Sequence, residues 1–138
     1  AQGGEERRLT CNSGDMHPDW SPDGKWVVFD SNRDGTSRLW RVSASGGQAE
    51  RLTKGAGVLP RWSLDGKQIY FIGFGDRANN VWTLSVGNRQ ERPVTALTGR
   101  RGVLGGLGLA TDGRYIYFTW EESRGDIWAA DIVHAPGK

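Results

Sequence analysis

Three segments of the chain carry the same pattern of hydrophobic positions. Each follows an Asp-Gly pair, and the segments read KWVVFD at 25–30, KQIYFI at 67–72 and RYIYFT at 114–119. Side chains two residues apart share one face of a strand, so Val27 and Phe29 lie on one face while Trp26 and Val28 lie on the other. Because both faces are apolar, each segment predicts a central strand that is covered on both sides.

A second segment with period two follows each of these strands. The three segments share one Trp at the matching place and read RLWRV at 38–42, NVWTL at 80–84 and DIWAAD at 126–131. Short alternating runs of this kind are typical of strands. They predict the third strand of each repeated unit.

The residues before the central strands form a turn motif. WSPDGK at 20–25 returns as WSLDGK at 62–67, and Asp112-Gly113 precedes the third strand. Pro22 presets φ for the second turn position, and Gly24 supplies the positive φ that closes a tight hairpin. Leu64 and Thr111 take the place of Pro22 in the other copies. The motif is therefore interpreted as structural, with no chemistry of its own.

The spacing of these motifs gives the number of units. The Asp-Gly pairs are spaced by 42 and 47 residues, and Trp40, Trp82 and Trp128 by 42 and 46. RLT at 8–10, RLT at 51–53 and ALT at 96–98 are spaced by 43 and 45. A unit of about 45 residues that occurs three times has the length of a β-propeller blade.

The predicted fold is all-β: a single β-propeller segment of three four-stranded blades, at about 11–53, about 54–98 and about 99–133. The RLT or ALT segment is the expected fourth strand, so ERRLT at 6–10 is spare and the third blade lacks one. Rings have about four to eight blades, and three would leave wedges too wide to close. We therefore expect a C2 homodimer, a ring of six blades in which each chain donates strand 6–10 to the third blade of its partner.

The three repeated units resemble a known family. The stretches PDWSPDGKWVVFDSNRDGTSRLWRVSASGGQAERLT, PRWSLDGKQIYFIGFGDRANNVWTLSV and LATDGRYIYFTWEESRGDIWAADI are similar to TolB-type β-propeller repeats, from Arg8 to Ile132. The third copy resembles the closing blade of propellers that form the sensor ends of bacterial kinases. The resemblance implies a propeller and a habit of binding, with no shared reaction. It also favours a periplasmic or extracytoplasmic location.

Composition and charge exclude several classes of protein. The chain of 138 residues has 21 Gly, 7 Trp and a net charge of +2, and its Lys and Arg are scattered singly, which argues against a nucleic-acid partner. No apolar run has the length of a membrane span, and residues 1–10 lack the hydrophobic stretch of a signal peptide. Cys11 is the single cysteine; it allows no internal disulfide and is expected to be a partly buried thiol.

Several segments imitate functional sites without completing them. DSNRDG at 30–35 matches the first half of a calcium loop, but Arg41 stands where a bidentate Glu is needed. The glycine-rich run at 102–113 lacks the spacing of a dinucleotide fingerprint. His17 and His134 are the available near-neutral bases, and no nucleophile elbow accompanies them. We therefore expect no catalytic residue, no metal and no cofactor.

The loops that enter each blade and the loops between second and third strands should share one rim of the propeller, where such rings bind their ligands. The candidate ligand-binding residues on this rim are Asp15, His17, Arg33, Asp34, Arg61, Asp76, Arg77, Arg100, Arg101 and Arg124. Their mixed charge favours a polar or peptide-like ligand.

These observations predict a non-catalytic interaction module that binds a protein, a peptide or a small polar ligand. Two alternatives stay open. In the first alternative, the chain is the accessory propeller of a hydrolase or peptidase, or the sensor domain of a bacterial kinase. In the second it is a truncated or engineered half-ring that self-assembles.

Overall fold

The computed structural model describes residues 4–77, 79–122 and 126–132, and in these the chain is all-β apart from one 3-10 turn, η1 (Gly75–Arg77). The first sheet contains β1 (Asp15–Trp20), β2 (Trp26–Ser31), β3 (Arg38–Ser43) and β4 (Glu50–Arg51). The second contains β5 (Gly57–Trp62), β6 (Gln68–Gly73), β7 (Val81–Ser85) and β8 (Glu91–Pro93). The third contains β9 (Val103–Thr111), β10 (Tyr115–Glu121) and β11 (Asp126–Asp131).

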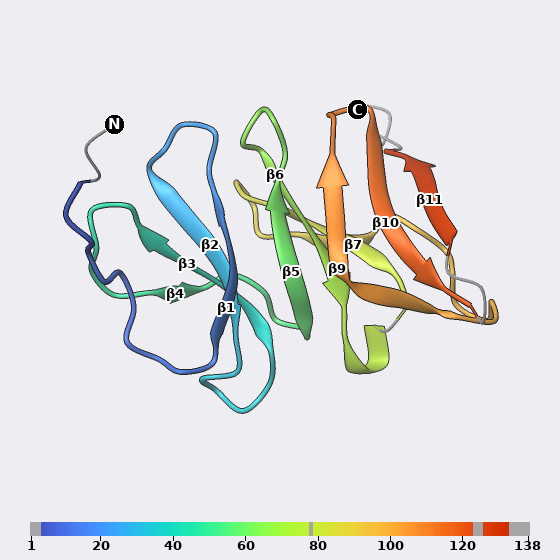
Figure 1. Ribbon diagram of the computed structural model, residues 1–138, viewed down its shortest axis with the longest axis horizontal. Helices are drawn as coiled ribbons and strands as arrows, with labels where there is room; N and C mark the ends of the chain where they lie inside the picture. Colours follow the sequence, from blue (N-terminus) through green and yellow to red (C-terminus); the bar gives the residue numbers. More distant parts are fainter. Residues whose placement is uncertain (1–3, 78, 123–125, 133–138) are drawn as a thin grey trace.

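The three antiparallel sheets stand side by side as consecutive blades (Figure 1). The first two have four strands each, in the orders β1-β2-β3-β4 and β5-β6-β7-β8, which confirms the predicted blade. The third sheet has the order β11-β10-β9, so it has three strands within the described part of the chain. Residues 6–10 are described but form no strand in this single chain.

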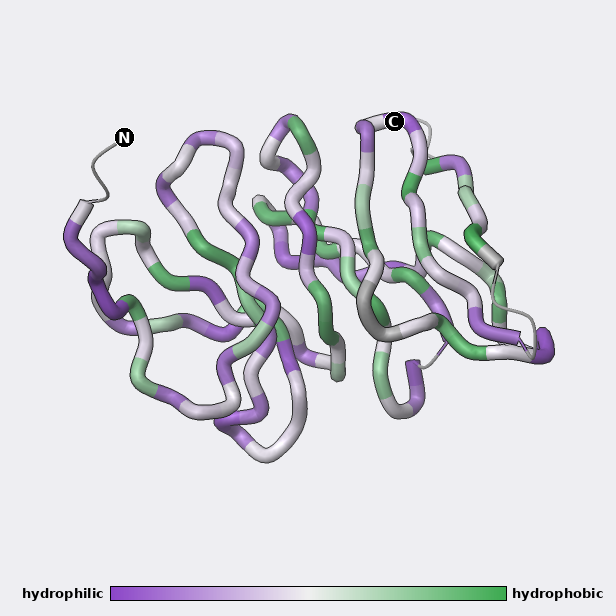
Figure 2. The backbone as a smooth tube through the Cα atoms, viewed as in Figure 1, coloured by the Kyte–Doolittle hydropathy of each residue, from purple (hydrophilic) through white to green (hydrophobic). Residues whose placement is uncertain are grey.

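The core lies between the blades, as the two-faced apolar strands require. Val28 of the first blade packs against Ile69 and Phe71 of the second, and Tyr70 on the opposite face of β6 packs against Ile116 of the third. The hydrophobic stretches run along these strands, while the loops at both ends are largely hydrophilic (Figure 2). Each blade thus contributes one face to each of its neighbours.

The first two Asp-Gly turns have the predicted geometry. The N–H of Gly24 donates to the carbonyl of Ser21 (2.8 Å), and Gly24 has φ of 69°. Gly66 and Ser63 repeat the arrangement. The third turn is shorter, because three residues separate β9 from β10 whereas five separate the first two strands of the other blades. Equating Thr111 with Pro22 was therefore wrong, since Thr111 is already the last residue of β9.

The outer strands correct the repeat register as well. In the first blade the N–H of Leu39 donates to the hydroxyl of Thr53 (3.1 Å), and in the second the N–H of Val81 donates to the hydroxyl of Thr95 (2.9 Å). Thr95, rather than the ALT segment at 96–98, is thus the counterpart of Thr53. The spacing is then 42 residues, the same as between Trp40 and Trp82.

The turn carboxylates are held in the ionised form. Hydrogen bonds from the Ser21 hydroxyl and the Lys25 N–H lower the pKa of Asp23. The N–H of Lys67 and the hydroxyl of Ser63 do the same for the pKa of Asp65. For Asp112, the pKa is lowered mainly by hydrogen bonds from the N–H of Tyr115, the hydroxyl of Tyr117 and the N–H of Arg114.

These turns predict acid sensitivity. Since the pKa of each carboxyl is lower in the folded than in the unfolded chain, its contribution to stability is present above the unfolded value of about 4 and is lost as pH falls through the folded value. We expect the urea midpoint to drop as pH falls below about 4. In a triple Asp23→Asn, Asp65→Asn, Asp112→Asn variant, the urea midpoint should fall less steeply with decreasing pH. An unchanged dependence of the midpoint on pH would show that these carboxylates are not the cause of the acid sensitivity. Asp76→Asn, at an exposed residue, is the control.

Candidate functional site

The loops that enter the first two blades lie at the same end of the sheets as the loops between their second and third strands. At this end of each blade, a residue of the loop between the second and third strands, or one near the end of the second strand, contacts the segment that enters the same blade. Arg33 donates to the Asp15 carboxylate (2.6 Å), the N–H of Phe74 donates to the carbonyl of Ala56 (3.3 Å), and the Trp120 indole donates to the carbonyl of Arg101 (3.2 Å). We call this surface the entering rim, and the opposite one, which carries the Asp-Gly turns, the turn rim.

Arg33 and Asp15 brace the first blade. The guanidinium of Arg33 lies over the ring of Trp40, 4.8 Å from its centroid, and over Phe29 at 5.3 Å. Burial raises the pKa of Asp15, but hydrogen bonds from Thr10, Arg33 and Ser31 outweigh it and leave the pKa below its usual value. This cation–π stack and ion pair hold the loop against its own sheet.

Arg77 has the same role in the second blade. Its guanidinium lies 4.4 Å from the centroid of Trp82, the counterpart of Trp40, and pairs with Glu91. Glu91 also accepts a hydrogen bond from the N–H of Lys54 (2.6 Å). Two arginines that the sequence placed on a binding surface therefore stabilise the blades themselves.

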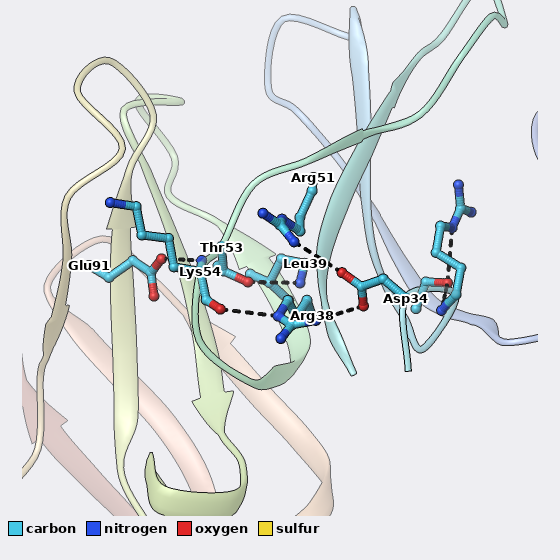
Figure 3. Close-up of polar contacts among 9 residues, drawn as sticks. Asp34, Arg38, Leu39, Arg51, Thr53, Lys54 and Glu91 are labelled. Atoms are coloured by element: carbon cyan, nitrogen blue, oxygen red, sulfur yellow. Dashed lines mark hydrogen bonds and ion pairs between the residues drawn. The ribbon is translucent and has the colours of Figure 1, made fainter. Parts of the chain in front are cut away.

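A polar network connects the first blade to the entrance of the second (Figure 3). Asp34 pairs with Arg38 (2.7 Å) and Arg51 (3.2 Å), and Arg38 donates to the carbonyl of Lys54 (3.1 Å). Burial raises the pKa of Asp34, but the hydrogen bonds from Arg51 and Arg38 outweigh it and the pKa stays below its usual value. Asp34 is thus a structural partner of two arginines.

His17 and Leu59 occupy equivalent positions in β1 and β5, and both have a positive φ, of 52° and 55°. Each lies in a bulge, where the strand register shifts. The buried carboxylate of Asp30 faces both bulges: its Oδ1 lies 2.8 Å from Nδ1 of His17 and accepts the N–H of Leu59 at 3.0 Å. Asp30 was absent from the predicted set because a lone Asp at the end of an apolar strand carries no sequence signal of its partners.

Arg61 corrects the predicted placement. It is the fifth residue of β5, next to Trp62 and the turn rim, so it does not lie on the entering rim. Its Nε donates to the carbonyl of Leu109 (3.0 Å) in the third blade. Asp19, at the equivalent position of β1, accepts the N–H of Trp62 (2.7 Å). These two residues join consecutive inner strands.

The remaining candidates differ in exposure. Asp76, Arg100 and Arg101 are exposed on the entering rim, and their side chains form no ion pair within the described part of the chain. Arg124 and His134 lie outside the described residues. Cys11 is exposed, so the expectation of a partly buried thiol was wrong; it stands in the entering loop, where few side chains cover it.

A cavity of about 410 Å³ on the turn rim was missed by the sequence reasoning. It lies between the first and second blades and is lined by the two repeated turns together with Trp26, Arg41 and Trp62. The Arg41 guanidinium covers the Trp26 ring at 4.0 Å and pairs with Glu50. The repeated turn motif was the sequence signal for this cavity. The motif was interpreted only as a hairpin turn, and the space between its two copies was not considered.

No group of three His, Cys, Asp or Glu side chains suited to a metal ion occurs in residues 4–77, 79–122 and 126–132. No helix in that part of the chain is long and apolar enough to cross a membrane.

The family model described as TolB beta propeller domain matches residues 1–133. The crystal structure of TolB from Acinetobacter baumannii is 25% identical, with a TM-score of 0.73, and the match covers 90% of this chain and 32% of that one. An uncharacterized protein of Agrobacterium fabrum is 46% identical over 54 residues, which are 38% of this chain and 18% of that protein.

The likeness extends to a catalytic protein. An acylaminoacyl peptidase is 16% identical with a TM-score of 0.54, over 86% of this chain and 24% of that one, and at this identity the likeness shows the fold alone. The chain therefore spans less than a third of the length of these three relatives.

Proposed function

The chain belongs to the TolB β-propeller domain family, and from this premise we propose that it is a non-catalytic interaction module whose first partner is a second copy of itself. In this assembly two chains related by a two-fold axis form a six-bladed ring. A peptide or small polar ligand would then bind on the entering rim.

One observation carries the proposal: the outer face of the third blade is apolar and uncovered, whereas its counterparts are buried. Val28 and Tyr70 face the next blade and are 0% and 3% exposed, but Tyr117 at the same position is 37% exposed. Ile127, beside it on β11, is also exposed. An uncovered apolar sheet face is the usual mark of a protein interface.

The first blade offers a matching surface. Val27 and Phe29 occupy the positions of Ile69 and Phe71, which receive the side chains of the preceding blade. A cavity of about 120 Å³ borders Val27, Phe29 and Val42. In the proposed ring the aromatic side chain of Tyr117 from the second copy fills this space.

Light scattering at micromolar concentration tests the assembly. We expect the mass of a dimer, and we expect a monomer after deletion of residues 1–10 or after Ile127→Asp, which places a charge in the interface. Circular dichroism should show that both variants keep their β-structure. A monodisperse monomer of the unchanged chain would contradict the proposal.

The exposed charges at Arg100 and Arg101 predict the ligand-binding part of the entering rim. We expect a labelled polyglutamate peptide to bind in low salt and Arg100→Glu with Arg101→Glu to weaken it at least about tenfold, since two attractive charges become repulsive. Lys25→Glu with Lys67→Glu changes the charge by the same amount on the turn rim and should be silent. Equal losses in both variants would show a general electrostatic effect.

The proposed absence of catalysis is supported by the use of the charged side chains in structural pairs. His17, the described histidine, faces the buried Asp30, and Arg33 and Arg77 brace their loops. Likeness to a peptidase at the level of fold carries no reaction. Turnover of a peptide ester that disappears in His17→Ala, or a stoichiometric transition metal in the purified protein, would contradict this proposal.

A further inference from the structure

β11 is the third strand of its blade. Its outer edge corresponds to the edge at which β3 and β7 pair with a fourth strand in the first two blades. In the first blade the N–H of Leu52 donates to the carbonyl of Leu39 (2.8 Å), and the N–H of Leu39 donates to the hydroxyl of Thr53 (3.1 Å). The second blade repeats both bonds with Val94 and Thr95 around Val81. An aliphatic residue followed by Thr is thus the pair that closes a blade here.

Ile127 is the counterpart of Leu39 and Val81, because each precedes the matching tryptophan of its third strand. Leu39 and Val81 are 0% exposed, while Ile127 is 84% exposed. Trp128 beside it is 44% exposed and borders a cavity of about 230 Å³. The third blade therefore presents the closing position with its apolar surface open.

Leu9-Thr10, just before the first blade, carries the same pair. Leu9 packs against Val27, Phe29 and Val42. These three are the counterparts of Ile69, Phe71 and Leu84, which share a cluster with Leu52. Leu9 thus already lies on the first blade as Leu52 lies on the second, in the place of an outer strand from a preceding blade.

Register and charge agree with this assignment. Trp40 lies opposite Arg51 and Trp82 opposite Pro93, so the same register sets Trp128 opposite Arg8 and Ala129 opposite Arg7. The exposed Asp131 then becomes a diagonal neighbour of Arg7. β11 carries two Asp and no basic residue, and the segment 6–10 carries two Arg against one Glu. Opposite net charges therefore meet across the proposed pair.

We propose that the edge of β11 is a sequence-selective peptide site that binds an extended segment with an aliphatic residue and Thr opposite Ile127, and that residues 6–10 of a second copy are its occupant. This inference rests on the proposed six-bladed dimer and gives it an atomic register. The backbone of β11 supplies general affinity, while the Thr hydroxyl and the aliphatic side chain supply selectivity.

A fluorescein-labelled peptide with the sequence of residues 6–10, Glu-Arg-Arg-Leu-Thr, tests the site on the full chain. Titration by fluorescence anisotropy should show saturable binding, and excess peptide should halve the mass of a dimer in light scattering. A Thr→Ala peptide should bind about fivefold more weakly, the value of one hydrogen bond. A Leu→Asp peptide should not bind measurably.

The protein variants separate this inference from the dimer itself. Ile127→Asp should abolish peptide binding, and Leu64→Asp, at another exposed aliphatic residue, should leave it unchanged. Binding by a monomeric chain would support the site and contradict the dimer. A dimer that excess peptide neither binds nor dissociates would overturn the site alone. The site would also be overturned if the Thr→Ala and Leu→Asp peptides both bound as tightly as the unchanged peptide, because the edge would then be unselective.

Discussion

Replacing Phe71 by alanine is expected to lower the free energy of unfolding by about 3–5 kcal/mol, the range for a fully buried aromatic residue. Phe71 is 0% exposed in the cluster between the first and second blades, where Val28, Leu39 and Leu52 meet it. Blades cannot collapse onto the space left behind, because their spacing is fixed by the other pairs in the same cluster. Urea denaturation followed by tryptophan fluorescence measures the loss.

Phe74→Ala is the matched control for this change. Phe74 stands three residues further along the chain, beyond the end of β6, and is 56% exposed. The same truncation there should change the free energy of unfolding by no more than about 0.5 kcal/mol. Equal losses at the two positions would show that the interface between blades is not where the stability of the chain resides.

The central strands were predictable because their signal is local. Val27 and Phe29 alternate with Trp26 and Val28, and the Asp-Gly turn before them fixes where the strand begins. Burial on both faces then requires neighbours on both sides, which gives stacked blades. The second and third strands of the first two sheets agree with this reasoning.

The register of the outer strands was harder because it depends on hydrogen bonds rather than on hydrophobic pattern. Two candidate segments end in Thr near the fourth strand of the second blade, Val94-Thr95 and Leu97-Thr98. Only the first brings its hydroxyl to the N–H of Val81. Thr98 instead accepts a hydrogen bond from Asn80 (2.7 Å), a contact that no repeat spacing indicates.

The sequence could place charged residues on the rim, but it could not show which of them are free and which form structural pairs. Sequence places Arg33 and Arg77 in exposed loops, and a charged loop residue usually points to solvent. In the fold, each arginine covers the tryptophan of its own third strand, a residue about five to seven positions away that only the hairpin brings close. Which arginine stays free is therefore decided by tertiary contacts.

Replacing Asp30 by alanine is expected to cost about 2–4 kcal/mol of unfolding free energy, because it removes two hydrogen bonds of one buried carboxylate. The N–H of Leu59 loses its partner inside the protein, and His17 loses the group that orients its ring. Both residues have a left-handed backbone conformation, which is unfavourable for a side chain of this size unless the surroundings hold it. The two bulges should then relax together.

Asp30→Asn separates the hydrogen bond from the charge. Its amide oxygen still accepts the N–H of Leu59, so we expect it to recover about half of the loss, whereas Asp30→Leu, similar in size, should recover none. Asp34→Ala removes an exposed carboxylate paired with two arginines and should cost less than about 1 kcal/mol. Hydrogen exchange of the Leu59 amide gives a local measurement: it should accelerate in Asp30→Ala and stay slow in Asp34→Ala. Unchanged protection at Leu59 in Asp30→Ala would contradict the assignment of Asp30 as the residue that holds the inner strands of the first two blades in register.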